Sequence, residues 1–134
     1  MKQLKDYIKR NGYQRAFIII KPGFIDKGKE IIDLFNENGW EIEKMRTKRL
    51  QPVEAEKLYE PHKQEEWFKP LCDYMCSGIC QGIILKKPSN NKSFNDVKKL
   101  KDEIREKYGE SDMRNVLHSS DSYERFDIES HIFF

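Results

Sequence analysis

The sequence contains no long apolar run and no large excess of charge of one sign. No apolar stretch approaches the roughly 20 residues that a membrane-spanning helix needs. The first twelve residues are charged throughout and hold no apolar segment of the signal-peptide kind. We therefore expect a cytoplasmic protein with no membrane partner.

The net charge is also small, at +2 from 25 Lys and Arg against 23 Asp and Glu. That balance is too even to indicate a nucleic-acid surface, and we expect no nucleic-acid partner. Basic residues are scattered among acidic ones, as in residues 98–103. We interpret that run as one solvated face of a helix.

Cysteine is scarce, and its three copies, Cys72, Cys76 and Cys80, are odd in number and lie four apart. A metal or cluster site is one interpretation of this helical spacing. The spacing matches no common zinc-ligand pattern, however, and the neighbouring residues are apolar. We favour the other interpretation, small buried or half-buried hydrophobic residues, and we expect no protein-bound metal.

Glycine and proline are few, with seven and five copies, and most of them separate periodic segments. The length fits one domain over residues 1–134, with a weakly helical N-terminal extension at 1–14, its helical periodicity lying between Lys2 and Asn11. The patterns predict strands at 16–20, 40–50, 79–85 and 115–118, and helices at 30–38, 51–59, 65–77, 94–107 and 121–129.

Strands separated by helices in this order predict an α/β sandwich. The arrangement β-α-β-β-α-β is ferredoxin-like, with an antiparallel four-stranded sheet covered by helices. Residues 40–45 alternate apolar with polar side chains, which predicts a half-exposed strand.

His118 lies where a short apolar strand meets helix-capping residues 119–122, so we expect it beside a helix N-terminus, a place that favours anions. A lone histidine is more often structural or on the surface than catalytic. Three cations near strand ends or loops are suited to hold polyphosphate oxygens: Lys21, Arg105 and Arg114. Glu129 on the last helix is placed to orient the imidazole from behind.

Several segments together resemble nucleoside diphosphate kinases. Residues 115–122, Asn-Val-Leu-His-Ser-Ser-Asp-Ser, resemble the Asn-x-x-His-Gly-Ser-Asp-Ser signature of that family. Four further segments are similar to family motifs in the same order, and they are residues 20–22, 71–78, 104–109 and 129–134. The resemblance covers about residues 15–134.

The resemblance implies a ping-pong reaction in which His118 takes the γ-phosphoryl group of a nucleoside triphosphate and passes it to a nucleoside diphosphate. Lys21 would contact the transferring group and the sugar hydroxyl, which Asn115 would also reach. Tyr59 would donate its hydroxyl to phosphate, and Arg105 would neutralise the β-phosphate. Mg²⁺ would arrive bound to the nucleotide.

The same resemblance gives Glu129, supported by Ser120, the task of holding the imidazole. The base would stack on Trp67 beside Leu71, although Phe68 could equally be the exposed ring. Because relatives assemble, we expect a homo-oligomer.

Three segments depart from the family pattern. Gly23 replaces an aspartate after Lys21-Pro22, and Ser119 replaces a glycine, where it would be strained if that position needs positive φ. The segment between Lys86 and Ile104 is shortened and lacks the usual Arg and Thr phosphate contacts, for which Lys98 or Lys99 is a candidate replacement. These departures support an alternative, a catalytically weak or inactive nucleotide-binding or regulatory domain of the same fold.

Overall fold

The computed structural model describes residues 12–88 and 94–134. Its sheet contains β1 (Tyr13–Ile20), β2 (Glu41–Lys48), β3 (Cys80–Pro88) and β4 (Leu117–Ser119) in the order β2-β3-β1-β4. Every neighbouring pair is antiparallel. This order confirms the ferredoxin-like arrangement. The helices are α2 (Gly28–Glu37), α3 (Pro52–Leu58), α4 (Phe68–Met75), α5 (Asn95–Tyr108) and α6 (Tyr123–Phe133), with short 3-10 turns η1 (Ile25–Lys27) and η2 (Glu60–His62).

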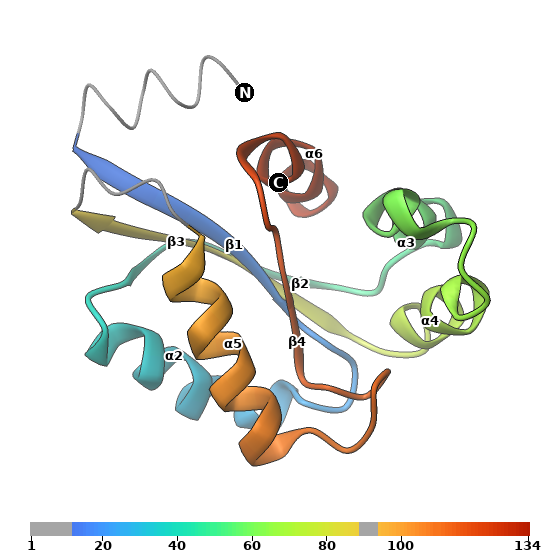
Figure 1. Cartoon of the computed structure of the whole chain (residues 1–134), viewed down its shortest axis with the longest axis horizontal. Helices are drawn as coiled ribbons and strands as arrows, with labels where there is room; N and C mark the ends of the chain where they lie inside the picture. The colour runs from blue at the N-terminus through green and yellow to red at the C-terminus, as the bar shows by residue number, and fades with distance from the viewer. Residues whose placement is uncertain (1–11, 89–93) are drawn as a thin grey trace.

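Strand β1 is buried along nearly its whole length, because helices cover both faces of the sheet. Phe17 and Ile19 enter a core that they share with α3, α4 and α6. Ile18 and Ile20 enter the opposite core, against α2 and α5. Figure 1 shows these two helical layers on either side of the sheet. The fully apolar run at 16–20 therefore identified the central strand correctly.

Several element boundaries differ from those expected. β1 begins at Tyr13, so residues 13 and 14 belong to the sheet and not to an N-terminal extension. The helix expected between Lys2 and Asn11 lies outside the described residues. α4 begins only at Phe68, because turns occupy residues 63–67. α6 continues to Phe133, whose ring is buried on the sheet.

Strand β2 is not the half-buried strand that its alternating sequence predicts. Ile42 and Met45 are 37% and 49% exposed. The register with β3 shifts between Ile42 and Lys44, which places an extra residue, Glu43, in the strand and breaks the two-residue alternation. β2 also forms one edge of the sheet, so only β3 pairs with it.

The cysteines are free thiols. Cys72 and Cys80 are buried and Cys76 is half-buried, which confirms their interpretation as small hydrophobic residues. Burial raises the pKa of Cys72 to about 11 and that of Cys80 to about 12. Cys80 begins β3, so the three do not share one helix. Across the described ranges, no group of three or more His, Cys, Asp or Glu side chains is arranged to hold a metal ion.

Within the part of the chain that the structure describes, no helix combines the length and the apolar character needed to cross a membrane.

Candidate active site

A cavity of about 800 Å³ opens between α3, η2 and α4 on one side and α5, β4 and α6 on the other. It brings together eight of the residues that the sequence singled out, namely Lys21, Tyr59, Trp67, Leu71, Arg105, Asn115, His118 and Glu129. They come from six separate parts of the fold. Such convergence of cations, a histidine and aromatic rings is typical of a small-molecule site.

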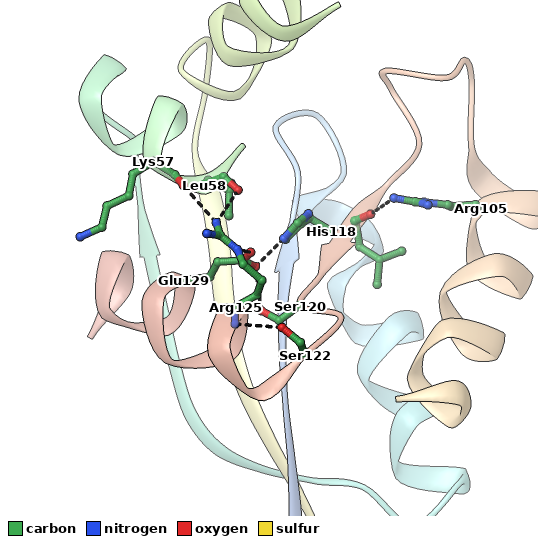
Figure 2. A network of polar contacts seen from close by, with 9 residues as sticks. Lys57, Leu58, Arg105, His118, Ser120, Ser122, Arg125 and Glu129 are labelled. Carbon is green, nitrogen blue, oxygen red and sulfur yellow. Dashed lines mark hydrogen bonds and ion pairs between the residues drawn. The ribbon is translucent and has the colours of Figure 1, made fainter. Parts of the chain in front are cut away.

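Glu129 anchors the imidazole of His118 by a short hydrogen bond, 2.7 Å from Oε1 to Nε2 (Figure 2). The hydroxyl of Ser120 donates to the same oxygen at 2.7 Å. The other oxygen, Oε2, accepts from Nε of Arg125 at 2.9 Å, a residue that the sequence analysis missed. The carboxylate is therefore held at both ends and is almost fully buried.

The protonation of this pair follows from its surroundings. Burial lowers the pKa of His118 below its ordinary value despite the opposing effect of Glu129, and the cations Lys21 and Lys101 lower it further. Burial alone would raise the pKa of Glu129, but hydrogen bonds from His118, Ser120 and Arg125 lower it overall. A neutral imidazole thus faces a carboxylate. Because the carboxylate accepts, the hydrogen-bond network assigns the proton to Nε2 and leaves the lone pair on Nδ1.

Lys21 follows directly after β1 and is buried beside the loop that leads into β4. Its ammonium donates to Oδ1 of Asn115 at 2.6 Å and to the carbonyl of Met113 at 3.3 Å. Burial, followed by the nearby charges of Arg105 and Lys101, lowers the pKa of Lys21 to about 7. Strand pairing fixes its position relative to the histidine, because Ile19 is the partner of His118 in the β1–β4 register.

Tyr59 ends α3 and meets the imidazole edge-on, with ring centroids 5.4 Å apart. Its buried hydroxyl has no hydrogen-bond partner among the described residues. Burial raises the pKa of Tyr59 well above its ordinary value, so the hydroxyl keeps its proton. The hydroxyl of Tyr59 is therefore available to donate a hydrogen bond to an anion bound in the cavity.

Helix α5 supplies two cations to the cavity, Arg105 and Lys101, one turn apart. Arg105 donates from Nη2 to the carbonyl of Leu117 at 2.8 Å, while its buried Nε has no partner in the described structure. Lys101 was interpreted as part of a solvated run, and that interpretation is wrong for this residue. Lys98 and Lys99, the two replacements considered from the sequence, are exposed and lie outside the cavity lining. The sequence signal for Lys101 is its position four residues before Arg105, which places the two side chains on the same face of the helix.

At the rim, Trp67 is the exposed ring, 46% accessible and 5.1 Å from the ring of His62. Phe68 packs instead against the core, which decides between the two aromatic candidates. Leu71 lies beside Trp67 in the lining. Arg114 does not join the cavity: it pairs with Glu110 at 2.9 Å and lies over the rings of Phe24 and Tyr74.

Comparisons with known proteins show the family of the chain. The family model described as nucleoside diphosphate kinase matches residues 14–134. A nucleoside diphosphate kinase of Saccharolobus solfataricus is 34% identical over 133 residues, covering 90% of this chain and 94% of its own. One of Fervidobacterium nodosum is 32% identical over 130 residues, covering 90% and 88%. The chain belongs to the nucleoside diphosphate kinase family.

Among solved structures, the nucleoside diphosphate kinase of Aquifex aeolicus superposes with a TM-score of 0.76 at 26% identity, covering 91% of this chain and 95% of its own. Membership in this family confirms the prediction of a phosphotransferase.

The family motif itself contains one unusual backbone conformation. Val116, two residues before His118, has a φ of 83°, a value that a β-branched residue rarely adopts. Its carbonyl accepts from the backbone N–H of Lys21 at 2.8 Å, which ties the two functional segments together. The concern that Ser119 would be strained was wrong, because among the described non-glycine residues only Val116 has positive φ.

Proposed function

We propose that this chain is a nucleoside diphosphate kinase that transfers the γ-phosphoryl group of a nucleoside triphosphate to a nucleoside diphosphate through a phosphohistidine at His118. The observation that carries the proposal is the bond from Nε2 of His118 to Glu129 inside a cationic cavity. That bond leaves Nδ1 as the nucleophile without the need for a separate base.

In the first half-reaction, the lone pair of Nδ1 forms a bond to the γ-phosphorus. The bond between this phosphorus and its β–γ bridging oxygen breaks, and the nucleoside diphosphate leaves with the electron pair. Positive charge develops on the imidazole, and the buried carboxylate of Glu129 stabilises it at 2.7 Å. In the second half-reaction, a terminal phosphate oxygen of another nucleoside diphosphate attacks the phosphohistidine, and Nδ1 recovers its lone pair.

The cations of the cavity suit the phosphate chain. Lys21 and Tyr59 would donate to the transferring group, while Arg105 and Lys101 would bind the phosphates behind it. The hydroxyl of Tyr59 and Nε of Arg105 support this assignment, because both atoms are buried and neither has a hydrogen-bond partner within the described residues. Mg²⁺ enters as part of the nucleotide and offsets the charge of its phosphates.

The nucleoside would occupy the outer part of the cavity. Trp67 offers an exposed ring for stacking on the base, with Leu71 beside it. Asn115, already bonded to Lys21, would reach the sugar hydroxyl. Stacking on one ring makes few demands on the edge of the base, so we expect the enzyme to accept several nucleotides.

A turnover assay with ATP and GDP, followed by chromatography of the nucleotides, tests the proposal. Formation of GTP by the wild type, lost in His118→Ala, is the expected result. Calorimetric binding of ADP without transfer for any nucleotide pair would instead favour the non-catalytic nucleotide-binding domain.

We also propose that the protein is a cytoplasmic homo-oligomer. The outer edge of β2 supports assembly, because it is unpaired within the described chain and carries the exposed side chains of Ile42 and Met45. Free thiols at all three cysteines are in keeping with a reducing compartment. Multi-angle light scattering should give a mass above the 16.1 kDa of one chain.

A further inference from the structure

Arg125 connects two parts of the active site that the sequence keeps far apart. It lies on α6, one turn before Glu129, and its Nε donates to Oε2 of Glu129 at 2.9 Å. Its Nη2 donates to the carbonyls of Lys57 and Leu58, at 3.1 Å each. Figure 2 shows the guanidinium between the end of α3 and the carboxylate. The side chain is only 16% exposed.

The two carbonyls belong to the last turn of α3, where carbonyls lack the N–H donor four residues on that a continuing helix would supply. The helix dipole also favours a cation there. Tyr59 follows immediately. A planar guanidinium can hold these carbonyls and a carboxylate in one fixed geometry, which a lysine ammonium cannot reproduce. The position of Tyr59 is thereby joined to that of Glu129.

The contact also fixes the orientation of the carboxylate toward His118. With Oε2 held by Arg125, Oε1 is presented to the imidazole and to Ser120. Without Arg125, one end of a buried carboxylate would lose its charged partner and be free to rotate.

We propose that Arg125 is a positioning residue that links the end of α3 to Glu129 and so holds the imidazole of His118 in register with Tyr59. The inference rests on the proposed function, in which that imidazole is the nucleophile. It acts through Glu129 and needs no contact with the nucleotide.

Arg125 is linked to the protonation of His118 through Glu129, because its hydrogen bond helps to lower the pKa of that carboxyl. The titratable and charged groups that line the cavity with the imidazole are Lys21 after β1, Tyr59 after α3, His62 on η2, Lys101 and Arg105 on α5, Asp112 in the loop before β4, Asp121 before α6, and Glu129 with Arg125 on α6. Removal of Arg125 takes away a cation and leaves the Glu129 charge less offset. The pKa of His118 should therefore rise, and the low-pH limb of the pH–rate profile should move to higher pH.

The experiment compares Arg125→Gln, Arg125→Lys and a control, Lys29→Gln, which removes a cation from an exposed i,i+4 pair with Asp33. Imidazole NMR titration gives the pKa of His118 without any turnover, and rapid quench with ATP gives the rate of phosphohistidine formation. For Arg125→Gln we expect a raised His118 pKa and a rate about tenfold lower. Arg125→Lys should keep the wild-type pKa but lose rate, and Lys29→Gln should change neither.

An unchanged His118 pKa in folded Arg125→Gln overturns the proposal, whatever the rate. If that variant does not fold, Arg125→Lys decides: a wild-type rate in it overturns the proposal. A wild-type rate of phosphohistidine formation in folded Arg125→Gln would indicate a purely structural arginine and would also overturn the proposal, even where the loss of its charge raises the His118 pKa. If the wild type forms no phosphohistidine, the proposed function fails, while the NMR titration still tests the role of Arg125.

Discussion

Replacing Lys101 by glutamine should weaken nucleotide binding without weakening the fold. Lys101 lines the cavity on the same helix face as Arg105, and no hydrogen bond or ion pair holds its ammonium within the described residues. Burial and the neighbouring charge of Arg105 lower the pKa of Lys101. An unpartnered, partly buried cation beside another cation is unfavourable until an anion binds.

The magnitudes follow from these contacts. A hydrogen bond to a charged group contributes about 1.5–3 kcal/mol, so Lys101→Gln should weaken ADP binding by roughly 10- to 150-fold. Like charges at i,i+4 on a helix destabilise it by about 0.2–0.5 kcal/mol. The free energy of unfolding of the nucleotide-free protein should therefore stay level or rise by a few tenths of a kcal/mol.

Calorimetry with ADP and Mg²⁺ gives the affinity, and urea unfolding without nucleotide gives the stability. Lys98→Gln is the matched control, because Lys98 carries the same charge on the same helix and is exposed outside the cavity. The reasoning would be refuted if Lys101→Gln bound ADP within twofold of the wild type, or if Lys98→Gln weakened binding equally.

Two further predictions concern backbone strain and protonation. Val116 has positive φ, so Val116→Gly should be at least as stable in urea as Val116→Ala, the reverse of the usual order, in which glycine is about 0.5–1 kcal/mol less stable. A clearly more stable alanine variant would contradict this. Because the pKa of Lys21 is lowered to about 7, and a bound phosphate raises it, ADP binding should take up a proton at and just above pH 7 and weaken as the pH rises further. Calorimetry in buffers of different ionisation enthalpy measures that uptake, which should disappear in Lys21→Met.

Most of the fold was predictable because its signals are local. The apolar run at 16–20 and the helical stripe at 30–38 both required burial, and the structure places them in β1 and α2. The failures depend on tertiary context. The bulge at Glu43 changes which side of β2 each residue faces. In the sequence it coincides only with the two adjacent polar residues, Glu43 and Lys44, that interrupt the alternation.

The site residues that belong to sequence motifs were predictable, and those that only the tertiary structure brings to the site were not. His118 and Glu129 lie 11 positions apart. Their places in the sequence singled out both residues, and two separate family motifs, at 115–122 and 129–134, supported them. Lys101 was missed because a charged run looks solvated until the angle of its helix to the cavity is known. Arg125 was missed since its partners include backbone carbonyls of Lys57 and Leu58, which have no sequence signal. The positive φ of Val116 opposes the preference of its side chain.

The central claim is that His118 carries the phosphoryl group, and the most direct test is the phosphoenzyme itself. Incubation of the wild type with γ-labelled ATP should give a label on the protein that is labile in acid, stable in base and mapped to His118 by mass spectrometry. Addition of GDP should remove it as labelled GTP. A wild-type protein that never becomes labelled would contradict the claim, as would a His118→Ala variant labelled to the same extent.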